Sequence, residues 1–378
     1  MTQTIDSLPT PALILDRAIL RRNLARMSRK LSAAGVHLRP HVKTAKSLDI
    51  ARMATAGHDG RITVSTLAEA RYFAGGGFKD IFYAVGIVPS KLAAVTALRR
   101  TGVNLRVLTD NLVVARAIAE AARGGDDFSV LVEIDSGAGR AGLPWPELPG
   151  LLDIARVLHD APNVDLAGVM THGGHSYHEN SAEGIARVAE QERTAVVDAA
   201  TRLRAAGIPC PIVSAGSTPT TTHGRSVEGI TEMRPGVYVF NDLDQVGIGS
   251  CGAGDMALSV MASVIGHYPH RNQLLIDAGA LALSKDISAQ EFMPRAGYGF
   301  VADPPVEELA VVACSQEHGF VGAEKPLPWA KLAIGSRLRV LPNHACITAA
   351  AYDRYHVVDS EESDGRTIVA TYDRINGW

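Results

Sequence analysis

Lys43 is the residue whose type and position point most directly to covalent chemistry. It lies near the end of an apolar and basic run from Leu38 to Thr44, Leu-Arg-Pro-His-Val-Lys-Thr. The run predicts a short buried strand that carries the lysine to its carboxyl end, where barrel enzymes keep their active sites. A lysine in such a cavity typically forms an imine with an aldehyde cofactor, and we therefore expect pyridoxal 5'-phosphate. A surface lysine at a strand end is the alternative.

His344 and Cys346 form a second candidate site, in the sequence Pro-Asn-His-Ala-Cys that starts at Pro342. Residues two apart on a strand point to the same face, so these two side chains could share one divalent metal ion. Imidazole and thiolate favour Zn²⁺, with Mn, Co and Mg as alternatives. Two protein ligands leave positions for water and substrate, which is typical of a catalytic metal site. A buried strand pair without a metal is the alternative.

Three polar residues that follow other predicted strands are candidates for holding the cofactor ring. Arg140, in a glycine-rich turn, could donate to the phenolate oxygen, and His172 could lie against the pyridine ring. No carboxylate is evident for the pyridine nitrogen, and Tyr177 is our candidate for that contact. A surface arginine and a buried histidine with satisfied hydrogen bonds are the alternatives for the first two.

Small and hydroxyl-bearing residues form the turn from Ser214 to Thr220, which contains Gly216, Ser217 and Thr218. Backbone N–H groups and the hydroxyl of Ser217 or Thr218 could bind a phosphate, and phosphate sites after the last strands of a barrel are common. Tyr238, at the end of the last predicted strand, is a further candidate for the cofactor site. An ordinary glycine–serine loop is the alternative.

The elements that must position these side chains are strand-like runs that alternate with amphipathic helical stretches. The eight runs are Leu38–Thr44, Ile62–Leu67, Asp80–Val85, Asn104–Asp110, Phe128–Asp135, Leu166–His172, Ile212–Thr218 and Glu232–Val239. A helix precedes them, with an N-cap at Asp16 and a stop at Gly35. Eight strand–helix repeats predict an α/β fold, a closed (β/α)8 TIM-like barrel. An open doubly wound sheet would carry a glycine fingerprint after its first strand, which is missing after Lys43.

After Asn241 the pattern changes to short strand-like runs, turns and proline-rich spacers, with weak helical periodicity. This change predicts a C-terminal all-β domain. We expect a cofactor-binding barrel over residues 10–245. The β domain would cover residues 246–378, include residues 1–9 and carry the metal site.

Composition limits the classes of protein to which the chain can belong. Its 378 residues are 46% hydrophobic and 20% charged, which suits one large and one smaller globular domain. A net charge of −3 with mixed signs argues against a nucleic-acid partner. No apolar run approaches the ~20 residues of a membrane span, and the first nine residues lack a signal pattern, so we expect no membrane association and a cytoplasmic protein. The cysteines are far apart, which argues against a disulfide scaffold.

With these residues in place, the chain resembles the pyridoxal-phosphate enzymes of the alanine-racemase-like fold, also called fold type III. Within them it resembles the branch that holds D-serine dehydratase, D-threonine aldolase and D-threo-3-hydroxyaspartate dehydratase. The resemblance extends from Thr10 to Trp378. Its most specific parts are Arg39–Thr44, Val213–Thr220, Gln316–Gly319 and Asn343–Cys346.

The resemblance implies that Lys43 carries the cofactor and that His344 and Cys346 bind the metal. It favours dehydration, because aldolases of the family more often have an aspartate at the position of Cys346. We therefore expect a carbon–oxygen lyase that converts a 3-hydroxy-D-amino acid, such as D-threo-3-hydroxyaspartate or D-serine, to a 2-oxo acid and ammonia. Lys43 would remove the α-proton while the metal assists loss of the β-hydroxyl.

Three other functions use some of the same parts. An aldolase would cleave the same class of substrate to glycine and an aldehyde. A racemase needs a base on each face of its substrate, and the metal pair argues against it. A non-catalytic pyridoxal-phosphate carrier resembles the barrel alone, and the long β domain argues against that. The resemblance also implies a homodimer, whereas the exact substrate stays open.

Overall fold

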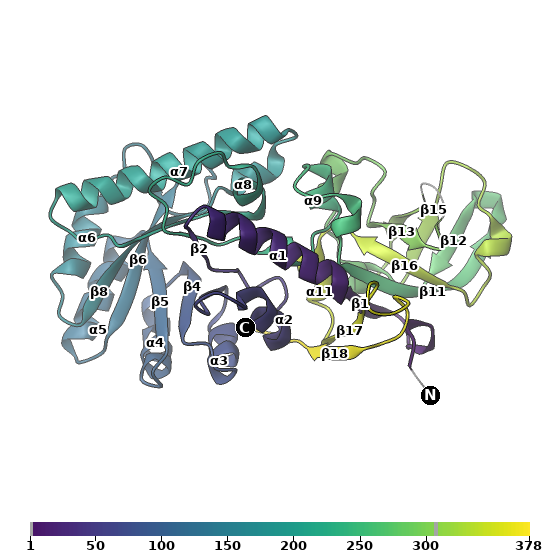
Figure 1. Ribbon diagram of the computed structural model, residues 1–378, viewed down its shortest axis with the longest axis horizontal. Helices are drawn as coiled ribbons and strands as arrows, with labels where there is room; N and C mark the ends of the chain where they lie inside the picture. Colours follow the sequence, from purple (N-terminus) through teal and green to yellow (C-terminus); the bar gives the residue numbers. More distant parts are fainter. Residues whose placement is uncertain (1–2, 306–308) are drawn as a thin grey trace. The chain divides into compact units, whose positions relative to one another are not determined.

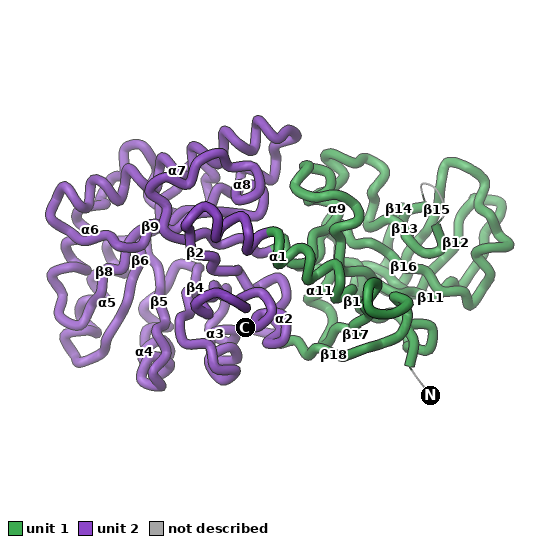
Figure 2. The backbone as a smooth tube through the Cα atoms, in the orientation of Figure 1, with its two compact units in different colours: residues 1–26, 237–376 green, residues 27–236, 377–378 purple. Residues whose placement is uncertain are grey.

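The computed structural model describes residues 3–305 and 309–378, and the chain divides into two compact units (Figure 2). The barrel unit comprises residues 27–236 and 377–378, and the β unit comprises residues 1–26 and 237–376. The expected boundary at 245 therefore lies a few residues later than this division. Residues 10–26 join the β unit because strand β1 (Ala12–Asp16) pairs with strands of that unit. Residues 1 and 2 of the expected N-terminal contribution lie outside the described residues.

The barrel unit contains the eight parallel strands that the sequence predicts. They are β2 (His37–Leu38), β3 (Ile62–Val64), β4 (Asp80–Gly86), β5 (Asn104–Thr109), β6 (Phe128–Asp135), β8 (Val164–Thr171), β9 (Ile212–Ala215) and β10 (Glu232–Met233), with a short β7 (Leu143–Pro144) beside β6. The order β2-β10-β9-β8-β6-β5-β4-β3 closes through a parallel bridge between His41 and Thr63. The predicted closed barrel is therefore confirmed. β2 ends earlier than Thr44, where we predicted its end, because Pro40 has no N–H to donate to a ladder.

Helices alternate with these strands and lie outside them (Figure 1). They are α2 (Leu48–Thr55), α3 (Leu67–Gly75), α4 (Leu92–Arg99), α5 (Leu112–Arg123), α6 (Leu151–His159), α7 (Ala182–Ala205) and α8 (Thr218–His223). Helix α1 (Arg17–Ala33) begins as predicted, since Asp16 Oδ1 accepts the backbone N–H of Ala18 at 3.0 Å. Gly35 follows its end with a φ of +67°. Among the described residues, no helix has the length and apolar character that a membrane crossing requires.

The interior of the barrel contains a buried ionic network. Arg39 is fully buried and donates to Glu232 at 2.8 Å and to Asp80 at 2.7 Å. Arg106 also binds Asp80. Two carboxylates thus offset the cost of burying the Arg39 guanidinium, and the network joins β2 to β10 and β4.

The β unit is built on a mainly antiparallel sheet, as the all-β prediction requires. Six strands form a closed ring, β12 (Gln273–Ile276), β15 (Gly319–Gly322), β14 (Ala310–Cys314), β13 (Gly299–Asp303), β16 (Arg337–Pro342) and β11 (Leu258–Tyr268). The sheet continues from β11 through β1 to β17 (Arg354–Val358) and β18 (Ala370–Asp373). Short helices α9 (Leu243–Gly247), α10 (Ala280–Leu283) and α11 (Ala345–Ala349) interrupt the strands. None of the four cysteines forms a disulfide bond.

Candidate active site and metal centre

Lys43 lies in the turn that follows β2, with its side chain exposed. The backbone around it is held firmly, because Val42 N–H donates to Thr63 O at 2.9 Å and Lys46 N–H donates to Val42 O at 2.7 Å. Lys46, by contrast, forms an ion pair with Glu69, with 3.0 Å between Lys46 Nζ and Glu69 Oε1. Among the described residues Lys43 has no ion-pair partner. A fixed backbone with an uncommitted amine suits a residue that bonds to a cofactor.

The barrel unit gathers His172 and Arg140 around Lys43. The pKa of His172 lies well below its usual value, first because burial removes water and then because Arg140 and Lys43 place positive charge beside it. The pKa of His41 is lowered in the same way by burial and by Lys43. Both imidazoles are therefore neutral at pH 7 and can accept or donate a hydrogen bond without adding charge to the site.

Tyr177 lies in the 3-10 helix Gly174–His178, close to His172. The two ring centroids are 6.5 Å apart, with 44° between the ring planes. The adjacent Ser176 reaches the predicted phosphate turn, because its Oγ lies 3.1 Å from Ser217 Oγ. The structure thus places Tyr177 beside the predicted cofactor residues, and its contact to the pyridine nitrogen stays a prediction.

The turn from Ala215 to Thr218 differs in detail from the expected phosphate cradle. Gly216 has a φ of +98°, and its N–H donates to Glu192 Oε1 at 3.0 Å. Ser217 N–H donates to Thr220 Oγ1 at 2.8 Å in a capping box for α8. Two of the backbone donors that we expected to bind phosphate are therefore already engaged. The Ser217 hydroxyl also accepts the N–H of Thr220 at 3.1 Å, and phosphate binding by the hydroxyls of Ser217 and Thr218 stays a prediction.

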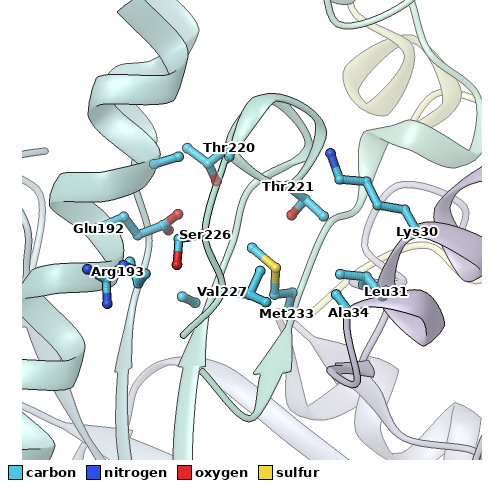
Figure 3. A pocket seen from close by; sticks show the side chains of 13 residues that line it. Lys30, Leu31, Ala34, Glu192, Arg193, Thr220, Thr221, Ser226, Val227 and Met233 are labelled. Carbon is cyan, nitrogen blue, oxygen red and sulfur yellow. The ribbon is translucent and has the colours of Figure 1, made fainter. Parts of the chain in front are cut away.

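Glu192 on α7 organises this turn, and we did not predict it. Its Oε1 accepts the N–H of Gly173 at 2.6 Å as well as that of Gly216, which ties the loops after β8 and β9 together. Glu192 and Thr220 line a cavity of about 30 Å³, enough for one water molecule (Figure 3). Burial raises the pKa of Glu192, and hydrogen bonds from Thr220 and Gly173 oppose that rise. In the sequence, the only sign of this role was a glutamate on the apolar face of an amphipathic helix.

Arg234, which follows β10, is a second residue whose role the sequence left unassigned. Its guanidinium is buried, donates to Thr171 O at 2.5 Å and contacts Ser214 Oγ. It also contributes to the lowered pKa of His41 and His172. Arg234 therefore supplies fixed positive charge beneath the residues that surround Lys43.

Tyr238 is buried in the 3-10 helix Val237–Val239 of the β unit, whereas the other predicted cofactor residues belong to the barrel unit. Burial raises the pKa of its phenol, so the hydroxyl stays protonated. A protonated phenol can donate a hydrogen bond to a phosphate oxygen. Its role in binding the cofactor stays a prediction.

His344 and Cys346 lie together, although not on a strand as predicted. Strand β16 ends at Pro342, His344 is the N-cap of α11, and Cys346 lies in that helix. The chain turns here because Asp242 Oδ2 accepts the N–H of Ala345 at 2.9 Å and so begins the helix. The prediction that the two residues lie on one strand was therefore wrong. They lie close together because His344 caps the helix that contains Cys346.

The surroundings of His344 suit a cation. His344 Nδ1 lies 2.7 Å from Asp286 Oδ2. Burial alone would lower the pKa of His344, but hydrogen bonds to Asp286 and Cys346 raise it to about 11. A position that holds a proton this tightly between a carboxylate and a thiol offers a metal ion an oriented imidazole and a sulfur ligand. Within residues 3–305 and 309–378, no third acidic, histidine or cysteine side chain completes a three-ligand cluster.

Comparisons with known proteins match both parts of the chain to known families. The family "Alanine racemase, N-terminal domain" matches residues 15–244, and "Putative serine dehydratase domain" matches residues 257–358. The chain is 42% identical to D-threo-3-hydroxyaspartate dehydratase of Delftia sp. (strain HT23), over 100% of both chains. It is 32% identical to D-serine dehydratase of Dictyostelium discoideum, over 94% of this chain and 95% of that protein. A 3-hydroxy-D-aspartate aldolase of Paracoccus denitrificans is 30% identical over 92% of this chain and 87% of its own length.

Solved structures agree with these matches. The Delftia dehydratase structure superposes with a TM-score of 0.95 at 41% identity and covers 100% of both chains. A cysteine-to-alanine variant of D-threo-3-hydroxyaspartate dehydratase, solved in the metal-free form, gives the same TM-score at 42% identity over 100% of both chains. The similarity thus extends through the barrel and the β unit alike.

Proposed function

Because this chain belongs to the alanine-racemase-like lyases that carry a serine dehydratase domain, we propose that it dehydrates 3-hydroxy-D-amino acids to 2-oxo acids and ammonia. D-threo-3-hydroxyaspartate and D-serine are the proposed substrates, after the substrates that name its relatives. The observation that carries the proposal is the pairing of His344 with Cys346 in a chain that also presents Lys43 at the mouth of a barrel.

The barrel residues fit pyridoxal phosphate. When bound, this cofactor supplies an electron sink for negative charge at the substrate α-carbon. Lys43 would hold it covalently, the Ser217 and Thr218 hydroxyls would bind its phosphate, and Arg140, His172 and Tyr177 would surround its ring. Gly216 supports this assignment, since a Cβ there would approach Thr221 Oγ1 to 2.9 Å and push into the turn.

Lys43 is the proposed general base. Its Nζ would take the substrate α-proton, and the β-hydroxyl would leave as water, so that H and OH are both lost from the substrate; this role requires a neutral amine during turnover.

His344 and Cys346 are the proposed metal ligands. A divalent metal supplies Lewis acidity, which a hydroxide leaving group needs at neutral pH. Nitrogen and sulfur donors favour Zn²⁺, which is our proposed metal. We propose that the enzyme acts as a homodimer located in the cytoplasm.

Aldol cleavage is the second candidate function, because aldolases also match most of the chain. Cys346 favours dehydration, and the dehydratases named above share more identity with this chain than the aldolase does.

Metal removal tests the proposal. The enzyme is treated with a strong chelator, assayed with D-threo-3-hydroxyaspartate and D-serine, and then reloaded with Zn²⁺. We expect chelation to abolish ammonia release while the cofactor absorbance remains, and Zn²⁺ to restore the rate. Full activity after thorough chelation would contradict the role of the metal.

A further inference from the structure

Asp286 lies in the loop between α10 and the next 3-10 helix and has both carboxylate oxygens engaged. Oδ2 lies 2.7 Å from His344 Nδ1, and Oδ1 accepts the backbone N–H of Ser288 at 2.8 Å. The contact with Ser288 fixes the position of the carboxylate on its own loop. The carboxylate can therefore determine the orientation of the His344 imidazole. Asp286 and His344 are 58 residues apart in the sequence, and only the folded β unit joins them.

The backbone just before Asp286 is strained. Ser284 ends α10 with a φ of +73° and a ψ of 173°, a region that residues with a Cβ rarely occupy. Its side chain accepts the Asp286 N–H at 3.2 Å, and the residue is buried. Strain of this kind persists where the surrounding structure requires it. Here it directs the loop so that Asp286 faces His344.

A carboxylate on Nδ1 determines which nitrogen of the ring remains for a metal. With the Nδ1 proton directed at Asp286, the lone pair is on Nε2, and the negative charge nearby makes that nitrogen more basic. We propose that Asp286 is a positioning residue of the metal centre, which fixes the orientation and tautomer of His344 and thereby sets the metal affinity. This inference rests on the proposed metal site at His344 and Cys346.

Asp242 has a different task, although it also lies near this site. Its two carboxylate oxygens accept backbone N–H groups, from Gln245 at 3.0 Å and from Ala345 at 2.9 Å. It therefore begins two short helices, α9 and α11, and its substitution would disturb the fold. Asp286 makes its cross-loop contact to the imidazole itself, which allows its effect on the metal to be separated from folding.

The test measures Zn²⁺ affinity of the metal-free, cofactor-loaded enzyme by competition with a fluorescent chelator. Asp286→Ala should weaken binding by about 10- to 100-fold, and Asp286→Asn, which keeps an acceptor without the charge, by a smaller factor. Cofactor absorbance should be unchanged in both. Glu324→Gln is the matched control, since it removes an exposed carboxylate of the same unit that pairs with Arg295, and it should leave the affinity unchanged.

A double substitution separates a positioning role from a general structural one. In the His344→Ala background, Asp286→Ala should cause no further loss of affinity, because Asp286 acts through the imidazole. An Asp286→Ala affinity within twofold of wild type, or an equal loss in both backgrounds, would overturn the inference. If His344→Ala itself left Zn²⁺ binding intact, the proposed metal site would be wrong, which is a distinguishable result.

Discussion

Glu192 Oε1 accepts the backbone N–H of Gly216 at 3.0 Å, and this bond sets the shape of the turn in which we place the cofactor phosphate. The same oxygen accepts the N–H of Gly173 from the neighbouring loop. One buried glutamate side chain on α7 therefore positions two loops at the carboxyl ends of the barrel strands.

Gly216→Ala should weaken pyridoxal phosphate binding strongly. Gly216 has a φ of +98°, and a Cβ would approach Thr221 Oγ1 to 2.9 Å and Met233 Cε to 3.1 Å, so the turn must shift. Gly207→Ala is the matched control, because Gly207 also has a positive φ, +81°, but nothing within 4 Å of the added Cβ. Equilibrium dialysis should show that the affinity for pyridoxal phosphate falls at least tenfold in Gly216→Ala and hardly changes in Gly207→Ala. Equal affinities would contradict the assignment of the turn.

Glu192→Gln should change how stability depends on pH. Burial raises the pKa of Glu192, so its favourable contribution is complete below the unfolded value of about 4.3 and is lost as pH rises through the folded value. Urea unfolding of both proteins should be measured between pH 5 and pH 8. As the pH falls, the free energy of unfolding of the wild type should rise relative to that of the glutamine variant. The opposite slope would mean that Glu192 is stabilised as a carboxylate.

Lys43→Ala should abolish both activity and the visible absorbance of the bound cofactor. The turn should persist without the lysine side chain, since its backbone is fixed by Thr63 and by the Lys46–Val42 bond. Lys46→Ala is the control, because Lys46 already pairs with Glu69, and it should keep the absorbance. If the absorbance survived in Lys43→Ala and disappeared in Lys46→Ala, the residue that binds the cofactor covalently would be Lys46 and not Lys43.

Asp80→Asn should destabilise the barrel by about 2 kcal/mol at pH 7, because buried Arg39 keeps only Glu232 as a charged partner. Although burial alone would raise the pKa of Asp80, Arg39 lowers it, so the contribution exists above the unfolded value of about 3.9 and is lost on acidification. The exposed pair Arg99–Asp127 gives the control Asp127→Asn, with an expected cost below ~1 kcal/mol. Equal unfolding free energies for the two variants would contradict the network.

The barrel could be predicted because its signals are local. Each strand is a short apolar run with a helix of 3–4 periodicity after it, and every one of the eight appears in the structure. Lys43 could be singled out for the same reason, since a lysine at the end of such a run is unusual. The assignment of residues 10–26 required knowledge of a long-range pairing, and the contacts place them with β11 and β17.

The supporting residues could not be predicted because they act over long sequence distances. Asp286 lies in a loop without periodicity, and nothing local connects it to His344. Glu192 had only its place on an apolar helix face as a signal. His344 and Cys346 were paired by a strand argument, whereas the Asp242 carboxylate makes them part of a helix start.

Product analysis of the Zn²⁺-loaded enzyme with D-threo-3-hydroxyaspartate tests the proposed reaction most directly. Dehydration yields oxaloacetate and ammonia in equal amounts, whereas aldol cleavage yields glycine and glyoxylate. We predict oxaloacetate and ammonia, with a rate that depends on Lys43, His344 and Cys346. Glycine and glyoxylate as the main products would contradict the dehydratase assignment and the role given to Cys346.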